Sequence, residues 1–354
     1  MKRITILRSK NTIELYEYVE DFYLISKKAN EMLERLRKGL PTWFPEKYDE
    51  MNISIWIYYD VKVNAFCYYE KEKNYIALSL GLLKTFSDVA EEFVHQENLS
   101  LVFKLSEGNK PYFAKSLYFY MLNFVIAHEL GHIAHGHLRE QNGEKGIDEM
   151  FQVSGGNDEK EKKEKNWITQ LKEYDADSFA VAMQALLFLQ RWDDDMKVNL
   201  CNFDVMYIAN YLCFRTFAEK TGRNFDMYFA KEIDEFDHPH PGIRMYYSNI
   251  LYADWIGRIR GFGKDTLAIM ESGTHAVVAY EKRGLDKKEV KESYYSVAFT
   301  KKGVQHLMSI HNDWQRLIDQ FNQYAYILIE KNENIDKMIF SLDENGHFFY
   351  EKRT

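Results

Sequence analysis

The stretch that decides the fold is Asn123-Phe-Val-Ile-Ala-His-Glu-Leu-Gly-His-Ile-Ala-His-Gly-His137, which places His128, Glu129 and His132 in the order H-E-x-x-H. Residues four apart lie on one face of a helix, so the two imidazoles can bind one zinc ion while Glu129 faces a water molecule on it. The preceding run 117–127 is almost wholly apolar, which predicts a helix buried on most sides. Titratable groups on such a helix need partners, because an unpaired polar group in a core costs roughly several kcal/mol.

Composition and charge narrow the class of protein. The 354 residues allow one large domain or about two, and the 46% of hydrophobic residues can bury a sizeable core. A net charge of −8 without a basic stripe gives no support for a nucleic-acid partner. The three cysteines, Cys67, Cys201 and Cys213, are widely spaced and odd in number. They argue against a disulfide framework and against a cysteine zinc site.

The sequence carries no signal for export or for membrane insertion. The apolar core of residues 1–10 is too short for a secretory signal. No uncharged apolar run approaches the roughly 18–20 residues that a membrane helix needs. We therefore expect a cytoplasmic protein with no membrane partner and no nucleic-acid partner.

Hydrophobic periodicity predicts an α+β chain that is mostly helical. Apolar residues at steps of three and four predict helices, whereas alternating or β-branched stretches predict strands. The predicted helices are 11–38, 81–96, 112–138, 167–192, 196–221, a part of 234–260, and 302–331. The predicted strands are 51–59, 61–69, 75–80, 276–280 and 294–299, with hairpin turns at 70–74 and across Glu344-Asn-Gly346. The charged stretch 139–166 predicts a solvated surface loop.

A catalytic zinc site needs a third protein ligand and one open position for water. His135 follows on the same helix, but it lies two turns, about 10 Å, beyond His128. We interpret His135 and His137 as neighbours of the site that are structural or face solvent. Glu173 is the better third ligand, because a carboxylate from a second, antiparallel helix can complete a tetrahedral site. Asp177, one turn further on, could accept the free N–H of a ligand histidine.

An acidic helix N-terminus, favoured by the helix dipole, is the structural alternative for Glu173 and Asp177. Glu129 would accept a proton from the zinc-bound water and later deliver it to the leaving amine.

These motifs and their order resemble the gluzincin peptidases of the CAAX-prenyl-protease and HtpX type, which have a zincin-like fold. H-E-x-x-H followed by Glu173-x-x-x-Asp177 carries the likeness. It extends to the hairpin Asn64-Ala-Phe66 followed by Tyr75-Ile-Ala-Leu-Ser-Leu-Gly-Leu-Leu83, and to His238-Pro-x-x-x-x-Arg244-Met245. Four elements in the right order are far more specific than H-E-x-x-H alone.

The resemblance implies roles for these residues. His128, His132 and Glu173 would hold one Zn²⁺ per chain. His238, or else His240, would donate to the oxyanion together with Tyr246, and Arg244 would orient Asp177 or Glu173. A structural role is the alternative for His238 and Arg244.

The hairpin of the resembling enzymes offers an edge strand that pairs with an extended substrate. We therefore expect the strand 75–80 to hold substrate through backbone hydrogen bonds. An ordinary core strand is the alternative. The residues predicted to bind substrate are Asn64, Tyr75, Ile76, Ala77 and Leu78.

A closer resemblance is to the soluble phage-exclusion peptidases of the Lit type. They share H-E-x-x-H, the acidic second helix, and a segment like His238-Pro-His-Pro-Gly-Ile-Arg-Met-Tyr-Tyr-Ser-Asn-Ile250. The likeness covers roughly residues 50–255 and does not reach the C-terminal hundred residues. It implies elongation factor Tu as a substrate by resemblance only.

We therefore predict a soluble zinc metalloendopeptidase that acts on a cytoplasmic protein. The predicted parts are an N-terminal helical segment (1–50), a zincin-like peptidase domain (51–260) and a C-terminal α+β accessory unit (261–354). A refinement is a phage-defence protease held inactive until a trigger or regulatory partner appears. The alternative is a catalytically silent sensor or binding protein with a degenerate peptidase fold.

Overall fold

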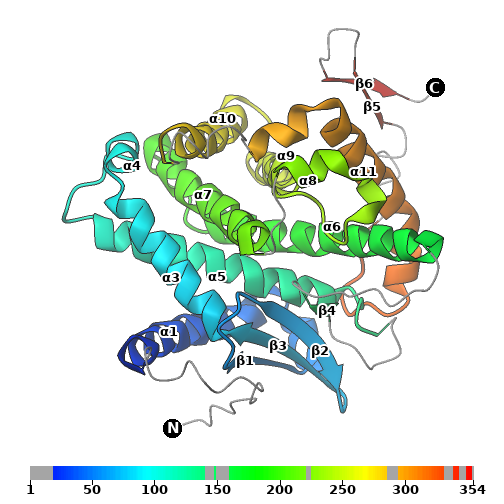
Figure 1. The fold of residues 1–354 in the computed structure, drawn as a ribbon, viewed down its shortest axis with the longest axis horizontal. Coiled ribbons are helices and arrows are strands. Elements are labelled where there is room, and N and C mark those ends of the chain that lie inside the picture. Colours follow the sequence, from blue (N-terminus) through cyan, green and yellow to red (C-terminus); the bar gives the residue numbers. More distant parts are fainter. Residues whose placement is uncertain are drawn as a thin grey trace.

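Helix α5 (Lys110–Ala134) carries H-E-x-x-H through the middle of the molecule (Figure 1). The structure is a computed structural model that describes residues 19–139, 147–148, 159–220, 225–284, 294–330, 338–342 and 348–352. From residue 120 to residue 134 every side chain of α5 is buried. The helix ends where Gly136 takes a positive φ of 76°, a backbone conformation that glycine adopts without strain.

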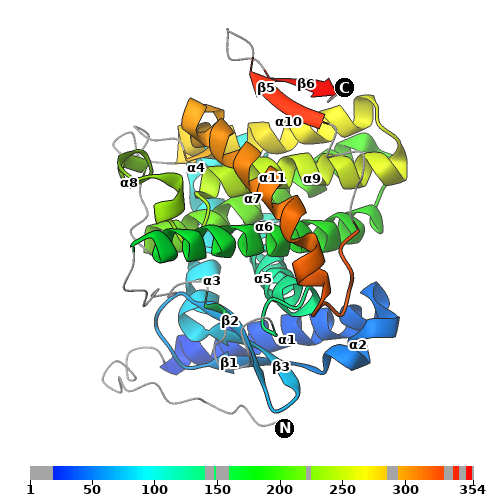
Figure 2. The ribbon, with the colours of Figure 1, turned by 90° about the vertical axis from the view of Figure 1, so that its right-hand side faces the viewer.

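A small sheet covers one side of α5, and most of the other helices lie on its opposite side (Figures 1 and 2). Its strands are β1 (Ile53–Tyr58), β2 (Ala65–Glu70), β3 (Lys73–Ser79) and β4 (Ile147–Asp148). The strand order is β1-β3-β2-β4, with β1 parallel to β3 and the other pairs antiparallel. Lys71 and Glu72 have φ of 49° and 62°, as the two central residues of a type I′ hairpin turn require.

The position of β3 corrects the prediction that the strand 75–80 offers a free edge. Tyr75 to Leu78 pair with β1 on one side and with β2 on the other, so their backbone groups already serve the sheet. Among the described residues, β2 is paired on its outer side only at Phe66 and Cys67, by β4. The strand with an available edge is therefore β2, and β3 is an interior strand.

The helices surround α5 in two groups. Those before it are α1 (Val19–Trp43), α2 (Pro45–Met51), α3 (Leu80–His95) and α4 (Glu97–Val102). Those after it are α6 (Glu159–Leu189), α7 (Met196–Lys220), α8 (Phe225–Ala230), α9 (Pro241–Arg260), α10 (Lys264–Ala279) and α11 (Lys301–Asn322). Helices α3, α6 and α7 pack directly on α5, and α9 packs on α6.

A glycine sets the close approach of α5 and α6. A Cβ atom at Gly131 would lie 3.0 Å from both the Cα of Ala176 and the Cβ of Phe179. The absence of a side chain at this position lets the two backbones come together. This contact brings the acidic residues of α6 beside the histidines of α5.

The predicted fold class is confirmed, since the described chain is mostly helical with a small sheet. Several predicted elements differ. The charged run 159–165 begins α6 and is not part of a loop, so Glu173 lies in the middle of a helix. Residues 140–146 and 149–158 of the predicted loop, and 11–18 of the first predicted helix, lie outside the described residues.

The predicted strand 276–280 is wrong, because α10 runs through it to Ala279. The predicted strand 294–299 is instead a 3₁₀ helix, η3 (Tyr295–Phe299). The C-terminal hairpin is present as antiparallel β5 (Met338–Leu342) and β6 (Phe348–Lys352), although its turn at 344–346 lies outside the described residues.

The division of the chain at residues 50 and 260 stays a prediction. Helices from the predicted C-terminal unit pack on the helices of the predicted peptidase domain: α10 contacts α7, and α11 contacts α6. Across the described ranges, each helix is too short or too polar to traverse a lipid bilayer.

Candidate metal centre

Three side chains from two helices converge in the core beside the sheet. His128 and His132 come from α5 and Glu173 from α6, and each is 0% exposed. The Nε2 atoms of the two histidines lie 3.1 Å apart. The Glu173 carboxylate lies 3.3 Å from Nε2 of His128 and 3.4 Å from Nε2 of His132.

These separations fit one zinc ion. With zinc–ligand bonds of about 2.0–2.1 Å, a tetrahedral arrangement places the ligand atoms about 3.3 Å from one another. Among the residues that the structure describes, none makes a hydrogen bond of standard geometry to the two Glu173 oxygens, so their lone pairs remain available. Among the described residues, His128, His132 and Glu173 are the one group of three such side chains that converges in this way.

Asp177 holds the first ligand histidine in place. Its Oδ1 atom lies 2.8 Å from Nδ1 of His128, which favours the tautomer with the proton on Nδ1 and a lone pair on Nε2, the form that binds a metal. Arg244 of α9 donates two hydrogen bonds to Asp177, from Nε at 2.8 Å and from Nη2 at 2.7 Å. Its guanidinium also lies 3.6 Å from Glu173 and stacks on Phe214. Arg244 therefore contacts both Asp177 and Glu173, and its role in orienting these carboxylates stays a prediction.

A tyrosine that the sequence did not single out completes this cluster. Tyr247 donates from its hydroxyl to Oδ2 of Asp177. Its neighbour Tyr246, which we expected at the oxyanion, packs edge-on against Phe299. The two side chains point about 100° apart because they are consecutive on a helix. The prediction for Tyr246 is thus corrected, and Tyr247 is the tyrosine at the cluster.

Glu129 lies beside the ligands and against β2. It is 0% exposed, and the Cys67 thiol of β2 lies against its carboxylate. Burial raises the pKa of Cys67 well above its ordinary value, and Glu129 raises it further, so the thiol stays protonated. This contact shows that β2 is the strand next to the glutamate of H-E-x-x-H.

His238 faces the centre and His240 does not. The Nε2 atom of His238 lies 3.7 Å from Glu173, and its Nδ1 atom lies 3.3 Å from Asp237. His240 caps α9 instead, because its Nδ1 atom accepts a hydrogen bond from the backbone N–H of Gly242.

His135 and His137 are both buried neighbours of the centre, so of the two alternatives, structural or facing solvent, the structure favours the structural one. The Nδ1 atom of His135 lies 2.5 Å from Asp175, and the Nε2 atom of His137 lies 3.1 Å from the same carboxylate. His137 also lies 2.8 Å from the ligand His132, between their Nδ1 atoms.

Burial and charge keep the ligands in the protonation states that a metal needs. Burial lowers the pKa of His132 to about 4 and that of His137 to about 3, so both imidazoles are neutral at pH 7. Burial raises the pKa of Glu173, but His238 and His128 lower it more, and the net pKa lies well below the ordinary value. Neutral imidazole and ionised carboxylate are the forms that bind zinc.

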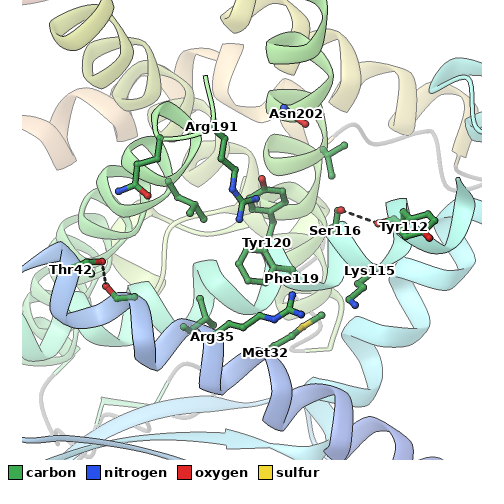
Figure 3. Close-up of a pocket in the computed structure, with 15 residues that line it drawn as sticks. Met32, Arg35, Thr42, Tyr112, Lys115, Ser116, Phe119, Tyr120, Arg191 and Asn202 are labelled. Atoms are coloured by element: carbon green, nitrogen blue, oxygen red, sulfur yellow. Dashed lines mark hydrogen bonds between the residues drawn. The ribbon is translucent and has the colours of Figure 1, made fainter. Parts of the chain in front are cut away.

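A surface cleft of 530 Å³ lies elsewhere, between α1, α5, the end of α6 and α7 (Figure 3). Its charged lining residues are Arg35, Lys115 and Arg191. Its nearest residue on α5 is Tyr120, eight residues or about 12 Å along the helix from His128. This cleft is separate from the candidate metal centre.

The comparison with protein families gives one match. The model of Peptidase family M48 matches residues 48–241, which is more than half of the chain and includes all the ligands described above. No curated protein and no solved structure matches the chain.

Proposed function

Because the chain belongs to peptidase family M48, whose members are zinc-dependent, we propose that it is a zinc metalloendopeptidase that cleaves a cytoplasmic protein. The observation that carries the proposal is the convergence of His128, His132 and Glu173 at zinc-binding separations, with Glu129 one residue after the first ligand.

The three ligands would leave one coordination position open for water or substrate. A zinc ion bound there lowers the pKa of water and polarises the scissile carbonyl. Glu129 takes a proton from the attacking water as the water oxygen bonds to the carbonyl carbon. It then delivers that proton to the amide nitrogen as the C–N bond breaks. His238, buried at the edge of the centre, donates a hydrogen bond to the carbonyl oxygen as negative charge develops there.

The substrate would bind as an added strand on β2. This strand carries Cys67 beside Glu129, and its outer edge is paired only at Phe66 and Cys67 within the described chain. An extended peptide on this edge would pass Glu129 with its backbone held by main-chain hydrogen bonds. Asn64, directly before β2, is the one predicted substrate-binding residue that remains in this proposal.

The closed state of the centre favours a regulated enzyme. Glu129 and the three ligands are 0% exposed, and β4 occupies the part of the β2 edge that lies nearest to Glu129. A substrate strand and β4 compete for the same backbone groups. We propose that β4 leaves β2 when the protease becomes active, which is the behaviour expected of a defence protease that waits for a trigger.

The phage-defence role and elongation factor Tu as substrate rest on the Lit-type resemblance. A catalytically silent sensor with the same fold is the second candidate. The intact set of Glu129, three ligands and Asp177 disfavours it, because a protein that only binds has no use for a buried general base.

Comparative proteomics of protein termini tests the proposal. Wild type and Glu129→Gln would be expressed in bacterial cells, with the trigger supplied by phage infection. A new terminus on a defined protein in the wild-type cells alone is the expected result. The same new terminus in both cultures would refute the role of Glu129, and zinc-free wild type would favour the silent sensor.

A further inference from the structure

A chain of close polar contacts between buried groups leads from the ligand His132 to the C-terminal helix α11. His132 faces His137 with their Nδ1 atoms 2.8 Å apart, and Nε2 of His137 lies 3.1 Å from Oδ2 of Asp175. The other oxygen of Asp175 accepts a hydrogen bond of 2.8 Å from the indole N–H of Trp314 on α11. His132, His137 and Asp175 are at most 1% exposed.

The charges and donors of these groups favour one arrangement of protons. An indole nitrogen only donates and an ionised carboxylate only accepts, so Asp175 accepts the N–H of Trp314. Among the described residues, Nε2 of His137 has no hydrogen bond of good geometry, but it lies 3.1 Å from the same carboxylate, and this negative charge favours the tautomer of His137 that carries its proton on Nε2. His137 is then left with a lone pair on Nδ1, which accepts the Nδ1 proton of His132. The Nε2 atom of His132 consequently carries a lone pair directed at the metal position.

We propose that Trp314, Asp175 and His137 are positioning residues that fix the metal-binding tautomer of His132. The inference deepens the proposed function and rests on zinc being the metal that this centre binds. Asp177 fixes the tautomer of His128 through one direct contact. For His132 the same effect requires three side chains in series, which we call the relay: His137, Asp175 and Trp314.

The relay gives α11 a role at the centre. The family match ends at residue 241, and Trp314 lies beyond it. Residues after α11 also contact the helix that carries the ligand histidines. The backbone N–H groups of Tyr326 and Ile327 both donate to the carbonyl of Ala134, at the end of α5. The C-terminal part of the chain is thus built into the metal centre rather than attached beside it.

The most direct perturbation is Asp175→Asn. The Trp314 N–H holds the amide oxygen on its own side, so the NH₂ group faces His135 and His137. His137 must then accept at Nε2 and carry its proton on Nδ1. Because the two Nδ1 atoms face each other, only one of them can carry a proton, and His132 then carries its own proton on Nε2. In this tautomer the Nε2 atom of His132 cannot bind a metal.

Trp314→Phe and Trp167→Phe form a matched pair. Trp167 on α6 also donates its indole N–H to a carboxylate across the α6–α11 contact, at 3.0 Å to Asp313, which takes no part in the relay. Both variants lose one indole–carboxylate hydrogen bond between the same two helices. Only the Trp314 variant touches the relay.

The experiment measures the zinc dissociation constant of the purified full chain by competition with a coloured chelator, after circular dichroism shows that the apo variants are folded. We expect Asp175→Asn to raise the constant about 10–100-fold, the range for lost partners of metal-binding histidines. Trp314→Phe is expected to raise it less, and Trp167→Phe to leave it within about twofold of wild type.

The relay is refuted if Asp175→Asn and Trp314→Phe bind zinc as wild type does, or if Trp167→Phe weakens binding as much as Trp314→Phe. A wild-type protein that fails to bind zinc would refute the proposed function itself. The two failures are therefore distinguishable without any measurement of peptide cleavage.

Discussion

Replacement of Arg244 by methionine should destabilise the protein by removing the counter-charge of a buried carboxylate. Arg244 and Asp177 have side chains that are 6% and 0% exposed, and two hydrogen bonds of 2.7 and 2.8 Å join them. Methionine keeps much of the apolar stem of arginine, which also packs on Phe214. The substitution therefore isolates the loss of the charge and its hydrogen bonds.

The expected cost follows from the partners that Asp177 retains. Removal of one member of a buried ion pair costs about 3–5 kcal/mol, because the other charge stays buried. Tyr247 and His128 still donate to Asp177, so we expect the lower end, about 3 kcal/mol. Burial raises the pKa of Asp177, but Arg244 lowers it below the ordinary value. The pair thus stabilises the fold above the unfolded pKa of about 3.9, and this stability is lost as the pH falls through the folded pKa.

Urea unfolding of the zinc-free protein at neutral pH, followed by circular dichroism, measures this cost. Arg258→Met is the control, because Arg258 pairs with Asp254 at 2.8 Å on the same helix but at the surface, with side chains 55% and 39% exposed. A surface pair of this kind contributes at most about 0.5 kcal/mol. Equal unfolding midpoints for Arg244→Met and wild type, or for the two variants, would contradict the reasoning.

Three further results are expected. Burial lowers the pKa of His306 to about 3, below its unfolded value of about 6.5, so the unfolded chain binds the extra proton. The unfolding free energy should therefore decrease as the pH is lowered from 6.5 to 4, by up to about 1.4 kcal/mol per pH unit for this group. His306→Asn should reduce this dependence on pH. Gly131→Val should push α5 away from α6, because a Cβ atom at position 131 would lie only 3.0 Å from the Cβ atom of Phe179. The variant should therefore bind zinc more weakly in a chelator competition. Ile147→Pro should impair the pairing of β4 with Cys67 and raise the rate of cleavage of a quenched peptide, and an unchanged rate would count against β4 as the barrier.

The local part of the centre could be predicted from the sequence because it depends on one helix. His128 and His132 share a face of α5 by spacing alone, and Glu129 follows from the same motif. Glu173 and Asp177 could be proposed from ligand chemistry, but an acidic helix N-terminus remained an alternative until the resemblance favoured the ligand role, since nothing in the spacing says that α6 packs on α5. Gly131 could have indicated that contact, because a glycine inside a helix often marks a close approach of two backbones.

The rest of the centre depends on packing that periodicity does not report. Tyr247 and Trp314 reach the cluster from α9 and α11, 70 residues from Asp177 and 139 residues from Asp175. The prediction of a strand at 276–280 was based on the β-branched residues of Ala-Val-Val-Ala-Tyr. It was wrong because these residues belong to α10, which packs on α7 and buries Val277. The edge strand was misassigned because the order of strands in a sheet is not encoded in the pattern of any one strand.

Zinc content and cleavage measured together on wild type, Glu129→Gln and Glu173→Gln test the central claim most directly. The account predicts about one zinc per chain in wild type and in Glu129→Gln, cleavage by wild type alone, and greatly weakened zinc binding in Glu173→Gln. Cleavage by Glu129→Gln at the wild-type rate, or full zinc retention by Glu173→Gln, would contradict it.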